Sequence, residues 1–323
     1  MLESDSALSF KDAVFITENA YYDNGLSRSH FDQSIAELSE LALFLSQNMN
    51  LLYDGHDKKE MQLQAAIFNT ITGQHGITID SAIELRAQPF VYDFDDFFGE
   101  QDWSKMFVTK LLKTNSGNCH SMPFLYKILT EELGVKAYLA MAPNHTYIKS
   151  YSEKLGWYNT ELTSATFPVD AWIMGSGYVH TDAVINRLYM DTLSLKQSIA
   201  ACVIDLAKGY EHRFGKTDTD FPLRCAELCL QYYPTYVNAM LLKAETLKAH
   251  FESKMKELEA KYASELLEIP EYQKQFETMQ TLYVQIHSLG YRQMPKQMYL
   301  NWLAELETQK EKYLNENFKE LTK

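Results

Sequence analysis

The hydrophobic periodicity of the chain changes twice, and this constrains the fold more strongly than any other feature of the sequence. Up to about residue 115, and again beyond about residue 181, apolar residues mostly recur every three or four positions, as on one face of a helix. Between these regions, a helical stripe from Met122 to Leu133 is followed by three runs of period-two character, "VKAYLAM", "HTYIKSY" and "GWYNTEL". A helix followed by three short strands predicts an antiparallel sheet packed on that helix, and so an α+β fold.

The region before this core is predicted to be helical. The stretch "FDQSIAELSELALFLSQN" places its apolar residues on one helical face, and a second helix is expected from Lys58 to Gly73. The stretch "TIDSAIELRAQ" is interpreted as a short helix with Asp80 or Ser81 as its N-cap. Residues 1–85 are therefore expected to form a helical region that packs on a core at residues 86–182.

Residues 183–323 carry a helix–turn–helix pattern. The stretch "RCAELCLQYYPTYVNAMLLKAETLKAHFE" predicts two helices separated at Pro234, with small residues where they cross. A second hairpin is expected in "LYVQIHSLGYRQMPKQMYLNWLAEL", broken at Gly290 and Pro295, after a charged helical insertion. This is the packing manner of tetratricopeptide (TPR) repeats, so these TPR-like helices are expected to offer a groove to a protein or peptide partner.

Charge and composition argue against several classes of partner. The net charge is −13 and no polybasic run is present, which argues against nucleic acid and anionic membrane surfaces as partners. No stretch approaches the roughly 18 apolar residues of a membrane span. The first residues, "MLESDSALSFKDAVF", are acidic where a secretory signal is basic. A cytoplasmic location is therefore expected for the sequence as written, or a periplasmic or extracytoplasmic one if a signal peptide has been removed.

The four cysteines do not suggest a disulfide framework or a metal site in a chain of this length. Cys225 and Cys229 share one helical face and are interpreted as buried apolar residues, because His212 alone would not complete a metal site. No metal and no cofactor are expected.

Cys119 differs from the other cysteines in its local sequence, "KTNSGNCHSMPFLYKILTEELG". It stands between a Ser-Gly-Asn turn and the start of the predicted helix, where unpaired N–H groups stabilise a thiolate. Gly117 would permit a close backbone approach, and the Cys119 N–H could face an oxyanion, with Asn118 and Asn115 as further candidate donors. The alternative is that Cys119 is an inert buried thiol.

A cysteine nucleophile needs a base, and the base needs a group that orients it. His145 follows the "APN" turn at the start of a predicted strand. Asn159 and Glu161 lie on the next strand and project on the same face as Trp157. These two residues are roughly 6.6–7 Å apart along the strand, so only one of them is expected to reach Nδ1 of His145. Alternation alone does not choose between Glu161 and Asn159.

These elements resemble a known family. The order of "GNC" (Gly117–Cys119), "HTY" (His145–Tyr147) and "GWYNTELT" (Gly156–Thr163) is similar to that of the transglutaminase-like superfamily of papain-type cysteine enzymes. The resemblance covers roughly Lys110 to Asp170. It is strongest to a bacterial branch in which such a core is followed by TPR-like helices.

The resemblance implies a papain/transglutaminase-like core that acts on an amide or ester bond, in a peptide or protein substrate, through a thioester. It implies that Cys119 is the nucleophile, His145 the base and Glu161 the orienting acid, where the family has Asp. Trp157 and Tyr147 are expected to line the cleft. The chain would then be a cysteine hydrolase or an acyl transferase.

One departure from the family is His120, which follows the cysteine where an aromatic residue is common. His120 is expected to point about 100° around the helix from Cys119, which makes it a poor candidate for the base. The competing hypothesis for the whole chain is a scaffold without turnover that binds a protein or peptide through its C-terminal helices.

Overall fold

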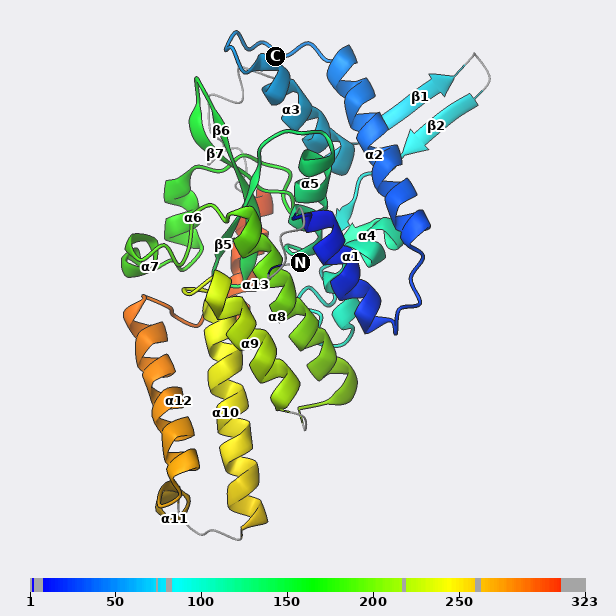
Figure 1. Cartoon of the computed structure of the whole chain (residues 1–323). Helices are drawn as coiled ribbons and strands as arrows, with labels where there is room; N and C mark the ends of the chain where they lie inside the picture. Colours follow the sequence, from blue (N-terminus) through cyan, green and yellow to red (C-terminus); the bar gives the residue numbers. More distant parts are fainter. Residues whose placement is uncertain are drawn as a thin grey trace.

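The computed structural model describes residue 2 and residues 8–73, 75–79, 83–216, 219–258 and 263–308. It combines many helices with small sheets, which confirms a mixed α+β fold in the broad sense. Helices of the N-terminal region and a projecting hairpin lie at one end, a helix and a sheet in the middle, and long helices at the other end (Figure 1). In the part of the chain described, no helix is both long and apolar enough to cross a membrane.

Three helices open the described chain, and serine side chains cap the first two. Ser9 accepts a hydrogen bond from the backbone of Asp12, and Ser27 accepts one from the backbone of His30, which satisfies N–H groups without a partner in the helix. The helices are α1 (Phe10–Tyr21), α2 (Arg28–Asn48) and α3 (Lys58–Thr72).

The prediction of a short helix after α3 is wrong. Strands β1 (His75–Ile79) and β2 (Ile83–Ala87) pair as an antiparallel hairpin instead. Residues Asp80 and Ser81, the expected N-caps, lie outside the described residues. In "IELRA" apolar and polar residues alternate, and this period of two favours a strand more strongly than an isolated capping signal favours a helix.

The centre of the molecule is helix α5 (Ser121–Glu132), which packs against the sheet that follows it. Pro123 lies in its first turn, and Gly134 has φ +68° just beyond its end, a conformation that suits glycine as a helix terminator. The three predicted runs all form strands of one antiparallel sheet in the order β5-β6-β7. Their bounds are β5 (Tyr138–Ala142), β6 (His145–Ser152) and β7 (Gly156–Thr160).

Short elements lead into α5. Strand β3 runs parallel to β4, and this pairing fixes the backbone immediately before Cys119. The elements are β3 (Val91–Tyr92), the 3-10 helix η2 (Trp103–Met106), α4 (Val108–Thr114) and β4 (Ser116–Gly117).

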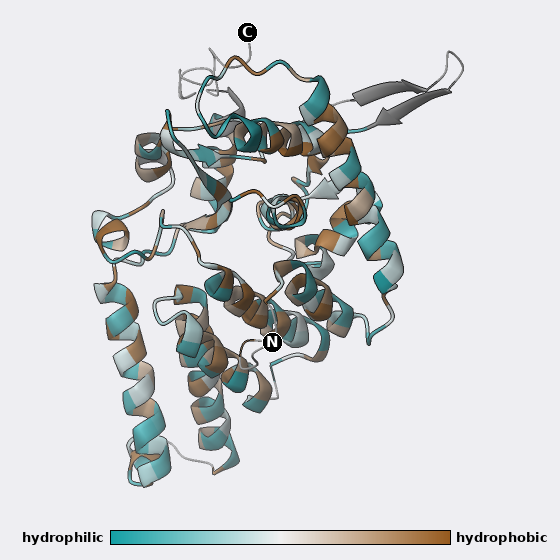
Figure 2. Ribbon diagram, turned by 45° about the horizontal axis from the view of Figure 1, so that its top comes forward, coloured by the Kyte–Doolittle hydropathy of each residue, from teal (hydrophilic) through white to brown (hydrophobic). Residues whose placement is uncertain are grey.

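The C-terminal region is helical, as predicted, and α9 ends at Tyr232 just before Pro234. Helix α12 is mostly hydrophilic along its length (Figure 2), and its buried side chains are Leu282 and Ile286. Helix α13 turns back onto the core, where the ring of Tyr299 contacts that of Phe97. The helices are α6 (Asp170–Ser176), α7 (Thr181–Ile185), α8 (Leu195–Phe214), α9 (Asp220–Tyr232), α10 (Val237–Glu257), α11 (Ala263–Leu267), α12 (Pro270–Ser288) and α13 (Lys296–Thr308).

The buried apolar side chains form a continuous core that draws on all three predicted regions. Phe10 of α1, Leu125 of α5, Leu139 of β5, Ala201 of α8 and Trp302 of α13 belong to one cluster. The N-terminal and C-terminal helices therefore share hydrophobic packing with the sheet that carries His145.

We expect Gly117→Ala to destabilise the turn that carries Cys119. A Cβ at Gly117 would lie 2.5 Å from Ser121 Oγ and 2.6 Å from Leu111 Cδ1, so these neighbours would have to move. The free energy of unfolding in urea should fall by roughly 1–3 kcal/mol. Gly175→Ala is the matched control, because no atom lies within 4 Å of a Cβ there. Equal stability of the two variants would contradict this packing.

Candidate active site

Cys119 lies immediately before α5, in a turn organised by Asn118. The Asn118 Oδ1 accepts hydrogen bonds from the backbone N–H groups of His120 (3.0 Å) and Ser121 (3.1 Å). Its Nδ2 donates to the Phe97 carbonyl at 3.1 Å and contacts Met106 Sδ. The Asn118 amide is therefore committed to the turn and is not directed at an oxyanion.

The structure brings the side chains of Cys119, His145 and Glu161 together. Asn144 adopts φ +57° and turns the chain into β6, which begins at His145. On one side the imidazole and the Cys119 thiol interact electrostatically. On the other side, His145 Nε2 lies 2.5 Å from Glu161 Oε2. The carboxylate thus holds Nε2, whereas the sequence interpretation had placed the orienting group at Nδ1.

The register of β6 and β7 selects Glu161 over Asn159. Asn159 stands opposite Lys149, which is four residues, or roughly 13 Å, along β6 from His145. Its amide donates to the Pro168 carbonyl and to Asp170 Oδ1 instead. Glu161 is two residues closer to the His145 end of the sheet, where its carboxylate can reach the imidazole.

The Glu161 carboxylate is buried and well supplied with donors. Its Oε1 accepts from the Thr163 backbone N–H at 3.0 Å and from Thr163 Oγ1 at 2.6 Å. Burial alone would raise the pKa of Glu161, but the charge and hydrogen bond of His145, together with the Thr163 donors, hold the pKa below its usual value. The group is therefore ionised and fixed in orientation.

Electrostatics favour an ion pair between the sulfur and the imidazole. Burial would lower the pKa of His145, but the Glu161 charge and the hydrogen bonds to Cys119 and Glu161 raise it to about 10. Burial would raise the pKa of the Cys119 thiol, and the His145 hydrogen bond and charge reverse that direction. By contrast, burial raises the pKa of Cys225 to about 11. The arrangement suits a thiolate beside an imidazolium.

The two predicted cleft residues occupy different places. Tyr147 is fully buried, and its ring is stacked parallel to that of His145 at 6.4 Å, so it supports the imidazole from within the sheet. Trp157 pairs with Tyr151 at the far end of the sheet and is 51% exposed. Trp157 therefore does not line a cleft at Cys119.

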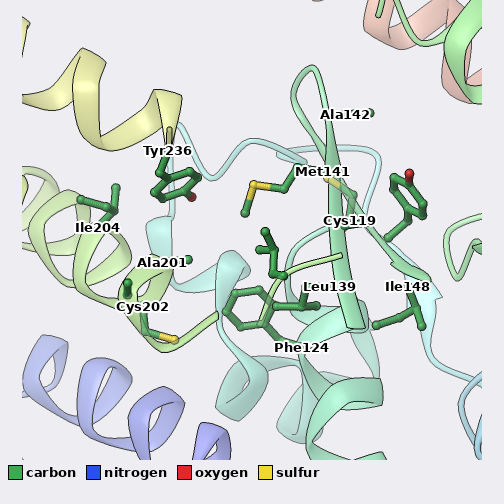
Figure 3. Close-up of a cluster of buried hydrophobic side chains, with 14 of the residues drawn as sticks. Cys119, Phe124, Leu139, Met141, Ala142, Ile148, Ala201, Cys202, Ile204 and Tyr236 are labelled. Carbon is green, nitrogen blue, oxygen red and sulfur yellow. The ribbon is translucent and has the colours of Figure 1, made fainter. Parts of the chain in front are cut away.

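A cavity of about 340 Å³ adjoins Cys119 between the core and the C-terminal helices. Figure 3 places Cys119, Met141 and Ala142 on one side of this part of the molecule and Ile204 and Tyr236 on the other. The lining is largely apolar and aromatic, with a few polar groups, as is usual for pockets that bind small molecules or peptide side chains. The polar and charged residues among it include His120, Asn144, His145, Thr146, Asp205, Lys208, Asn238 and Glu245.

Helix α13 covers the other side of the thiol, which sequence reasoning missed. Tyr299 Oη lies 3.1 Å from Cys119 Sγ and 3.4 Å from His145 Nδ1. The ring of Trp302 meets that of His145 edge-on, with centroids 4.4 Å apart. Cys119 and His145 are each 5% exposed as a result. The spacing of Tyr299 and Trp302, three residues apart, is typical of one helix face, but nothing local indicates what that face packs against.

No family model matches the chain. No curated protein and no solved structure matches it either. Among the described residues, no group of three or more His, Cys, Asp and Glu side chains is arranged to hold a metal ion.

We expect Trp302→Ala to expose the sulfur. Loss of this ring removes buried contacts worth roughly 3–5 kcal/mol, so α13 should detach more often from the core. Labelling of Cys119 by a bulky maleimide, located by peptide mass spectrometry, should accelerate at least about tenfold. Met298→Ala, on an exposed part of α13, should leave the rate unchanged. Equal rates in both variants would show that α13 does not control access.

Proposed function

We propose that the chain is a cysteine-dependent hydrolase or acyl transferase of the transglutaminase-like, papain-type class. The observation that carries this proposal is the grouping of Cys119, His145 and Glu161 beside a cavity, in which His145 is hydrogen-bonded to Glu161 and interacts electrostatically with Cys119. The order of Cys119, the helix α5 that follows it and the antiparallel sheet β5–β7 is consistent with the resemblance noted in the sequence.

The proposed reaction follows from the charges of these three groups. The Cys119 thiolate attacks the carbonyl carbon of an amide or ester and forms a carbon–sulfur bond. The His145 imidazolium then gives its proton to the departing amine or alcohol as the carbonyl re-forms, which leaves a thioester on Cys119. Glu161 keeps its charge throughout and stabilises the imidazolium.

The second half of the cycle depends on the acceptor. Neutral His145 removes a proton from water, which attacks the thioester and releases a carboxylic acid and the thiolate. An amine acceptor would give a new amide by the same steps. We favour water as the acceptor, because water needs no binding site of its own beside the thioester.

The Cys119 N–H is the proposed oxyanion donor. It lies at the N-terminal end of α5, and no described residue accepts a hydrogen bond from it. A helix N-terminus carries partial positive charge, which would stabilise the developing oxyanion.

A scaffold without turnover is the second candidate, because Tyr299 and Trp302 of α13 cover the sulfur and the base. In that case the site would be a structural polar cluster, and binding would belong to the C-terminal helices.

An acylation experiment separates the two functions. With excess p-nitrophenyl acetate, the wild-type chain should release one equivalent of nitrophenolate in a burst and carry an acetyl group on Cys119, located by mass spectrometry. Cys119→Ser should lose the burst because a serine hydroxyl stays protonated beside His145. Absence of acetyl-Cys119 in both wild type and Trp302→Ala would contradict the enzyme and favour the scaffold.

The pH dependence of this acylation follows from the thiol. The reactive form is the thiolate, and its fraction grows as pH rises through the thiol pKa, which is held below its usual value. The acylation rate should therefore reach half its maximum below pH ~8.5, the ordinary thiol pKa. His145→Ala should move this midpoint upward, since burial then acts unopposed by the imidazolium. A midpoint that is unchanged by His145→Ala would contradict the ion pair.

A further inference from the structure

A second histidine next to the thiol is held between two hydrogen-bond acceptors. His120 is the N-cap residue of α5 and directly follows Cys119. Its Nδ1 lies 2.9 Å from the Met106 carbonyl oxygen, and its Nε2 lies 3.1 Å from Asp205 Oδ2 of α8. The ring also packs on Phe124 at a centroid distance of 3.9 Å.

The geometry determines the protonation of this ring. A carbonyl oxygen and an ionised carboxylate only accept hydrogen bonds, so both ring nitrogens of His120 donate when Asp205 is ionised. Neutral imidazole has one N–H, whereas the imidazolium has two. Because both nitrogens are occupied in this way, His120 is not placed to take a proton from Cys119.

We infer that His120 is a positioning residue, kept as a cation at neutral pH by Asp205, and that this cation helps to hold Cys119 as a thiolate. The inference rests on the proposed role of Cys119 as the nucleophile. It assigns part of the electrostatics of the site to α8, a helix of the C-terminal region, beyond the Cys119–His145–Glu161 series.

The surrounding charges support a cation at this position. Asp205 of α8 and the adjacent Cys119 interact with His120. Glu18 of α1 also interacts with it, although burial raises the pKa of Glu18 to about 7. Burial would lower the pKa of His120, but the Asp205 charge and hydrogen bond, the Met106 carbonyl and Cys119 raise it to about 9. Lys208 also lines the cavity but is paired with Glu211 at 2.9 Å.

The same charge acts on the sulfur. His120 and Cys119 are adjacent in the chain and line the same cavity. The charge of His120 lowers the pKa of Cys119 alongside His145 and Tyr299, whose hydroxyl donates to the sulfur. An opposite charge nearby favours the ionised form of a group. Tyr92 and Tyr299, the other titratable groups near the sulfur, have their own pKa raised by burial and stay neutral.

The decisive variant is Asp205→Asn, because two explanations predict opposite signs. If the carboxylate acted on Cys119 only through its own negative charge, its removal would make the thiolate easier to form. If the carboxylate acts by keeping His120 charged, its removal neutralises the ring and makes the thiolate harder to form. We expect the second result. The midpoint of Cys119 alkylation by iodoacetamide against pH should rise by about one unit.

Two further measurements complete the test in the full-length chain. Nitrogen NMR of labelled histidines should find both ring nitrogens of His120 protonated at neutral pH in the wild type, and one in Asp205→Asn. His120→Gln removes the cation directly and should raise the midpoint in the same direction, which keeps the test open if Asp205→Asn folds poorly. Glu252→Gln removes an acidic charge of α10, and neither Glu252 nor its partner Lys248 lines the cavity, so this variant should leave the midpoint unchanged.

The outcomes separate this inference from the proposed function. A neutral His120 in the wild type overturns the inference, as does a midpoint that stays or falls in both variants. Acetylation of Cys119 with either of these results would leave the hydrolase proposal standing. If the midpoint rises in the variants while Cys119 is never acylated, the inference on His120 stands and the catalytic proposal fails.

Discussion

The site depends on a buried series of charges, in which the His145 imidazole joins a thiol to a carboxylate. A charge removed from water is costly unless a partner of opposite sign and a full set of hydrogen bonds accompany it. Here Glu161 accepts from His145 and from two groups of Thr163, and the His145 and Glu161 side chains are both buried. The surrounding structure must hold the three groups in one geometry, because any one of them alone would be an uncompensated charge.

Two features of the fold provide that geometry. The start of α5 fixes the sulfur through the Asn118 turn, and the register of β6 with β7 brings Glu161, the residue after β7, towards the His145 end of the sheet. A slip of one residue in this pairing would turn Glu161 to the other face of the sheet. The C-terminal helices then cover this site, since α8 brings Asp205 to His120 and α13 brings Tyr299 to the sulfur. The centre is thus shared between regions far apart in sequence.

Local patterns predicted much of this arrangement. The helical stripe of α5 and the three period-two runs appear as expected, because each signal lies within ten or so residues and buried faces repeat with the period of the element. Cys119 and His145 could be chosen because their positions at the start of a helix and of a strand are local features. The choice between Glu161 and Asn159 could not be made, because it depends on strand register. The β1–β2 hairpin was missed because a capping signal was preferred to a short alternation. Tyr299, 180 residues from Cys119, and Asp205, 85 residues from His120, meet their partners only through the tertiary packing of the helices.

The most direct measurement is the ultraviolet absorbance of the thiolate at neutral pH, taken as the difference between the wild-type chain and Cys119→Ala. The account predicts the absorbance of a thiolate in this difference, and its disappearance when the same comparison is made in a His145→Ala background. No thiolate signal in the wild type, or an equal signal without the imidazole, would contradict the claim that Cys119 and His145 form an ion pair.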